Sequence, residues 1–141
     1  MLEMLYMNGN VDILNVLLEF GLSVNYQKAV SHASLLMRFS VLNKLACVRM
    51  LIDQGADVNL RDSVGNNALM YATSAGDIEI IQLLLDNGGS LIRNNLGYGP
   101  LDLLRNMQAI APQTSTHFTE IGNLLLQAGR STTREEEGEG M

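Results

Sequence analysis

The sequence of 141 residues is short of several residue types, and each shortage narrows the range of folds. It contains two prolines, one cysteine and no tryptophan, and aromatic residues make up 5% of it. Scarce proline favours helices, and the lack of tryptophan argues against a tryptophan-anchored β-sandwich. A lone Cys47 cannot build an internal disulfide framework, which fits a reducing compartment.

Basic clusters and long apolar runs are missing too. The net charge is −6 and the nine Lys and Arg residues are scattered, so the chain has no surface suited to neutralising phosphates, and nucleic acid is not an expected partner. No apolar run approaches the roughly 20 residues that a membrane helix needs, and the N-terminal stretch lacks the basic region of a signal peptide. We therefore expect no membrane partner, and a cytoplasmic protein, with the nucleus as the alternative location.

Apolar residues are plentiful. They make up 47% of the sequence against 17% charged residues, which is too apolar for a disordered chain. The length suits one domain with a substantial buried core.

An internal repeat organises these apolar residues. Each unit reads as a short helix, a tight turn, a longer helix and a glycine. The closing glycines are Gly21, Gly55, Gly88 and Gly129, spaced by 34, 33 and 41 residues. The short helices are expected at Leu2–Met7, Leu36–Leu42, Leu69–Ala75 and Leu101–Met107.

Two stretches carry a family resemblance. Asp62–Gly89 resembles one complete ankyrin repeat, and Gly55–Asn59 (GADVN) resembles the usual exit from its second helix. The resemblance implies an all-α solenoid in which stacked neighbours bury each other's apolar faces. The expected units of the array at residues 1–129 are 1–26, 27–59, 60–93 and 94–129. The Glu- and Gly-rich residues 130–141 are expected to form a disordered acidic tail.

The apolar spacing agrees with helices that bury one face. Ile80, Ile81, Leu84 and Leu85 share one helical face, and Gly55, Gly88 and Gly129 suit the left-handed position that ends a helix.

Both ends depart from the pattern. The first unit starts inside its first helix and offers Leu2, Met4, Leu5 and Met7 as an apolar outer face. Either the chain is a fragment or short isoform of a longer array, or this is an unusual cap. In the last unit, about eight extra residues within 109–117 separate the helices, where Pro112 must interrupt any helix.

Catalytic chemistry finds no support in the sequence. His32 and His117 lie in different repeats, with Cys47 as the sole thiol, whereas zinc needs three or four ligands. We expect His32 at a surface turn and His117 at the start of the last helix. The Gly97–Gly99 pair stands at a repeat turn, with Asp102 where a phosphate-binding loop needs a third glycine. No enzyme activity, metal, cofactor or small-molecule substrate is therefore expected.

The resemblance implies an adaptor or scaffold that binds a partner protein through its turn tips and the exposed side of its short helices. The expected contact residues are Arg61, Ser63, Val64, Asn66, Ser74, Asn95, Leu96, Tyr98, Asn106 and Met107. Leu96 and Met107 are expected to flank Tyr98, which stands between two glycines as the expected centre of an exposed apolar patch. The alternatives are a stoichiometric inhibitor of an enzyme such as a protein kinase, and a structural segment of a larger ankyrin-repeat protein.

Overall fold

The computed structural model describes residues 2–111 and 115–139, so Pro112 lies outside the described residues. Within these ranges the fold is all-helical, as predicted, apart from one isolated bridge between Gln27 and Ser34. The helices are α1 (Leu2–Asn8), α2 (Val11–Glu19), α3 (Leu35–Val41), α4 (Leu45–Asp53), α5 (Ala68–Ala75), α6 (Ile78–Asp86), α7 (Pro100–Ile110) and α8 (Ser115–Glu139).

Polar side chains fix where several helices begin. The side-chain oxygen of Asn10 accepts hydrogen bonds from two backbone N–H groups at the start of α2, and the side chains of Asn67 and Asp77 each accept one such bond at the start of α5 and α6. These bonds satisfy donors that have no partner within the helix. Gly76 ends α5 in the left-handed conformation, which lets α6 turn back directly against it.

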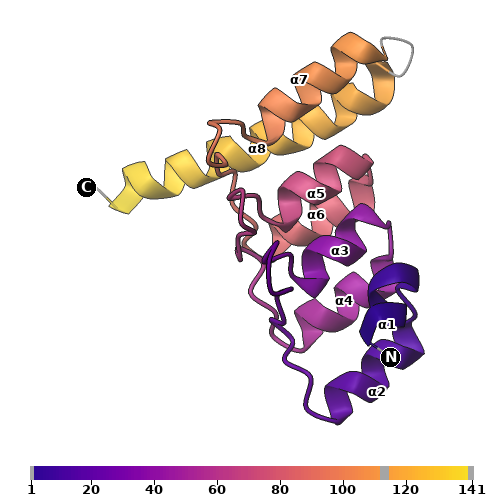
Figure 1. Ribbon diagram of the computed structural model, residues 1–141. Helices are drawn as coiled ribbons and strands as arrows, with labels where there is room; N and C mark the ends of the chain where they lie inside the picture. The colour runs from indigo at the N-terminus through magenta and orange to yellow at the C-terminus, as the bar shows by residue number, and fades with distance from the viewer. Residues whose placement is uncertain (1, 112–114, 140–141) are drawn as a thin grey trace.

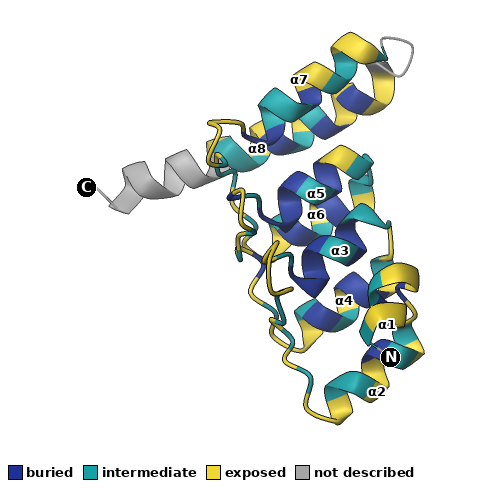
Figure 2. Cartoon of the chain, in the orientation of Figure 1, coloured by how far each residue is buried: buried dark blue, intermediate teal, exposed yellow. Residues whose placement is uncertain are grey.

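The helices stack as successive pairs (Figure 1). The short helices α1, α3, α5 and α7 pack in that order, and α2, α4, α6 and α8 form the second row. Each helix carries buried residues, most of them on α3, α4, α5 and α6 (Figure 2). Ile80, Ile81 and Leu84 are fully buried, as the spacing predicted, whereas Leu85 is partly exposed. No described helix is long and apolar enough to span a bilayer.

The C-terminal helix corrects one expectation. Gly55 and Gly88 have positive φ angles as predicted, and so does Gly21, but Gly129 lies inside α8 and does not end it. A single glycine costs a helix only about 1 kcal/mol, and the residues that follow are rich in Glu and Arg, which favour helix. α8 thus extends to Glu139. It includes residues 130–139 of the stretch 130–141, which was expected from the sequence to be a disordered tail.

The N-terminal helix pair, α1 and α2, corrects a second expectation, which concerns Leu5. Leu5, expected on an outer apolar face, is fully buried, because α1 packs against α2 and α3. Met4 and Met7 are exposed, and Leu2 is partly buried against the core.

Candidate functional site

The turn tips that precede the short helices are joined from repeat to repeat. The backbone N–H of Ser63 donates to the carbonyl of Ser31 (2.8 Å), and that of Asn95 donates to the carbonyl of Val64 (2.8 Å). The side chain of Gln27 adds a bond to the carbonyl of Arg61 (2.9 Å). The tips therefore form one connected edge along the stack.

In each of two successive tips, one side chain also accepts hydrogen bonds from the backbone of the same tip. Asp62 Oδ1 accepts from the N–H groups of Val64 and Asn66, both at 2.9 Å. Asn94 Oδ1 likewise accepts from the N–H groups two and four residues on, both at 3.0 Å. Asp and Asn side chains commonly close turns in this way, so these two tips hold a defined shape. Neither residue was among the predicted site residues, although their matching places, three residues before Gly65 and Gly97, were visible in the sequence.

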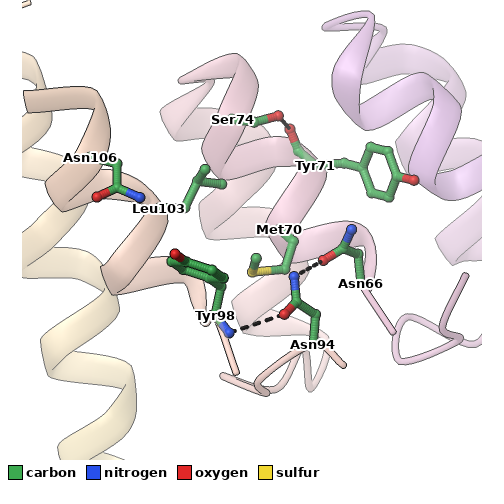
Figure 3. A pocket seen from close by; sticks show the side chains of 8 residues that line it. All are labelled: Asn66, Met70, Tyr71, Ser74, Asn94, Tyr98, Leu103 and Asn106. Atoms are coloured by element: carbon green, nitrogen blue, oxygen red, sulfur yellow. Dashed lines mark hydrogen bonds between the residues drawn. The ribbon is translucent and has the colours of Figure 1, made fainter. Parts of the chain in front are cut away.

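A cavity of about 350 Å³ opens between the third and fourth tips and their short helices (Figure 3). Four predicted contact residues line it: Asn66, Ser74, Tyr98 and Asn106. Four further lining residues were not predicted: Met70, Tyr71, Asn94 and Leu103. Met70 is nearly buried, and its side chain gives the cavity an apolar wall.

The other predicted residues lie outside this cavity. Leu96 and Val64 are exposed on the tips, Leu96 with 73% of its surface accessible. Met107 was expected to flank Tyr98 but is partly buried and packs against the core instead. Arg61, Ser63 and Asn95 are exposed on the tips.

A second cavity, of about 560 Å³, lies on the same face over the first three repeats. It is lined by Leu2, Glu3, Tyr6, Met7, Tyr26, Lys28, Ser31, Ala33, Arg38, Val41 and Tyr71. Tyr71 lines both cavities, and its ring points away from Tyr98 (Figure 3). We call the two adjoining cavities together the tyrosine groove, because their lining includes all four tyrosines of the chain, Tyr6, Tyr26, Tyr71 and Tyr98.

Two of these tyrosines are held as neutral hydrogen-bond donors. The Tyr6 hydroxyl donates to the carbonyl of Ala33, and burial, with a smaller effect of Tyr26, raises the pKa of Tyr6 to about 12. The Tyr71 hydroxyl donates to Asp62, and burial together with that hydrogen bond and the charge of Asp62 raises the pKa of Tyr71. Both bonds tie a ring to a turn tip, which fixes the walls of the groove.

The two histidines stand apart from the groove. His32 is an exposed turn residue with a φ angle of 56°, and His117 lies in the first turn of α8, as predicted for both. The His117 ring lies 2.6 Å from the carbonyl oxygen of Gly76 and so links α8 to the end of α5. In the described part of the chain, no three His, Cys, Asp or Glu side chains are grouped to hold a metal ion.

Comparison with known proteins agrees with this geometry. A family model for ankyrin repeats matches residues 2–95 in three copies, which leaves α7 and α8 as a further helix pair beyond the match. Rat "Ankyrin repeat and SAM domain-containing protein 6" is 40% identical over 74 residues, 51% of this chain and 8% of the relative. Human "Ankyrin repeat and SOCS box protein 6" is 30% identical over 97 residues, 64% of this chain and 23% of the relative. "Protein HOS4" of Saccharomyces cerevisiae is 33% identical over 86 residues, 56% of this chain and 8% of the relative. The chain thus matches less than a quarter of the length of each of these relatives.

Proposed function

Since this chain belongs to the ankyrin-repeat family, whose repeats are general protein–protein interaction modules, we propose that it binds a partner protein in the tyrosine groove. The proposed role is that of an adaptor or scaffold, and it needs no catalytic step.

The position of the tyrosines carries the proposal. All four line one face, although the chain has only seven aromatic residues of the Phe, Trp and Tyr types. Tyrosine offers a large apolar area with a polar tip and few rotatable bonds, which is why it is enriched among the residues that dominate binding energy. Tyr98, with 47% of its surface exposed, is the strongest single candidate.

The bonded tips support the proposal in a second way. A binding surface that is already ordered loses less conformational entropy when the partner arrives. The bonds from Ser63 and Asn95 to neighbouring repeats, and the turns closed by Asp62 and Asn94, order this face before binding.

Site-specific photocrosslinking tests the proposal. Tyr98, or Phe20 as a matched control, is replaced by p-benzoylphenylalanine in cells, and covalent adducts are collected after irradiation. Phe20 is an aromatic residue with 85% of its surface exposed, and it follows α2 outside the groove. We expect a defined protein adduct from position 98 and none of comparable yield from position 20. Adducts from position 20 alone would place the binding surface elsewhere.

A further inference from the structure

The groove also indicates what the partner presents to it, an inference that rests on the proposed function. We propose that the cavity over the first three repeats binds a side-chain carboxylate of the partner, held between Lys28 and Arg38. The partner segment therefore carries Asp or Glu at one place and uncharged residues beside it.

Both cations contact Tyr6, one at its backbone carbonyl and the other at its ring. Arg38 Nε donates to the backbone carbonyl of Tyr6 (2.6 Å), which holds the guanidinium group at the wall of the cavity. The ammonium group of Lys28 lies over the Tyr6 ring, 5.5 Å from its centroid, within the range of a cation–π contact. One tyrosine thus positions both positive charges.

Neither cation has a carboxylate partner in the described part of the chain, where the ion pair is Arg93 with Asp102. The terminal nitrogens of Arg38 keep hydrogen-bond donors in a planar arrangement that suits a carboxylate. Arg38 is partly buried, so a carboxylate bound beside it would be partly removed from water, where the attraction between opposite charges is stronger.

The charge on the longer helices is opposite in sign to the net charge of this cavity. The longer helices α2, α4 and α6 carry five acidic residues against one basic residue. These are Asp12, Glu19, Asp53, Glu79 and Asp86 against Arg49. An acidic segment is therefore repelled by the long-helix side of the stack and attracted to Lys28 and Arg38.

A carboxylate fits the charge of the cavity better than a phosphate. Glu3 also lines it, so Lys28 and Arg38 leave a single net positive charge among the lining residues. One carboxylate neutralises that charge, whereas a phosphate group, with a charge of about −1.5 to −2, exceeds it and faces Glu3.

The adjoining cavity beside Tyr98 calls for uncharged residues. None of its lining side chains is charged, and Met70 and Leu103 supply apolar surface. In the described structure, the side-chain amide of Asn106 and the Nδ2 group of Asn66 have no hydrogen-bond partner, so both can bond to a polar group of the segment. We expect an apolar or aromatic residue there, next to the acidic one.

The test uses random peptides displayed on phage and selected on the full chain. Selected peptides are synthesised, together with versions in which each acidic residue becomes its amide, and their Kd values are measured by fluorescence anisotropy. We expect Asp or Glu at one recurring place. Changing that residue to its amide should weaken binding about tenfold to the wild-type chain, but by less than about threefold to Arg38→Gln.

Two further variants guard against a folding artefact. Lys28→Gln removes an exposed charge whose contact is with the Tyr6 ring, and it should weaken acidic peptides about threefold or more. Arg49→Gln removes an exposed arginine from α4 on the long-helix side and should leave Kd unchanged. High salt should reduce the preference for the acidic peptide over its amide.

The outcomes separate this inference from the proposed function. Peptides that Tyr98→Ala weakens, but that show no acidic preference and bind Lys28→Gln and Arg38→Gln like wild type, would overturn the carboxylate site alone. Tighter binding when phosphoserine replaces the acidic residue would also overturn it. A failure to select peptides, or peptides indifferent to Tyr98→Ala and to both cation variants, would count against the groove itself.

Discussion

Replacing Ile81 by aspartate tests whether the repeats are held together by the stripe of apolar residues on their longer helices. Ile81 lies in α6 with none of its surface exposed. Loss of a buried isoleucine side chain alone costs about 2–5 kcal/mol, and a buried carboxylate without a partner costs several more. Ile81→Asp should therefore lower the free energy of unfolding by at least about 4 kcal/mol, a large part of the roughly 5–15 kcal/mol typical of a folded domain.

Urea denaturation followed by circular dichroism measures this loss. The control is Gln82→Asp, which places the same side chain one residue further along α6 on its exposed surface and should cost less than about 1 kcal/mol. An Ile81→Asp chain with the wild-type urea midpoint would mean that this face of α6 is not buried, and the assignment of the core would be wrong.

Three further predictions concern Tyr6 in the groove and the two ends of the chain. Because the pKa of Tyr6 is raised to about 12 in the folded chain, its contribution to stability is complete below pH 10 and is lost as pH rises toward 12. Tyr6→Phe should reduce the alkaline destabilisation seen in denaturant titrations, and an identical alkaline loss would refute this. Amide exchange in α1 and α2, which have one neighbouring pair, should precede exchange in α5 and α6, which have two; equal protection would contradict a nearest-neighbour stack. Deleting residues 130–141 should leave the melting temperature unchanged, whereas a large drop would show that this segment stabilises the array.

The fold was predictable because it depends on repetition. The spacing of Ile80, Ile81 and Leu84 sets the buried face of α6, and a left-handed glycine after each of the first three long helices marks its end. Gly129 misled the prediction because glycine permits a left-handed turn but does not require one. Where good helix formers follow, the helix continues.

The site was less predictable because it depends on side-chain directions and on contacts between repeats. The predicted positions Asn66, Ser74, Tyr98 and Asn106 do meet around one cavity. Met107, one residue from Asn106, packs against the core, since neighbouring residues on a helix point about 100° apart. The cavity of Tyr6, Lys28 and Arg38 was missed because it joins residues from different repeats that are far apart in the sequence.

The most direct test of the account compares Tyr98→Ala with Phe20→Ala, using the partner captured from position 98 or, failing capture, a selected peptide. Tyr98 lines the groove and Phe20 lies outside it. The first variant therefore removes an exposed aromatic ring from the proposed binding surface, and the second removes one from outside that surface. Tyr98→Ala should weaken binding by about 2 kcal/mol or more, roughly thirtyfold in Kd, while changing stability by less than about 1 kcal/mol. Phe20→Ala should leave Kd unchanged. An unchanged Kd for Tyr98→Ala, with Phe20→Ala impaired, would contradict binding through the tyrosine groove.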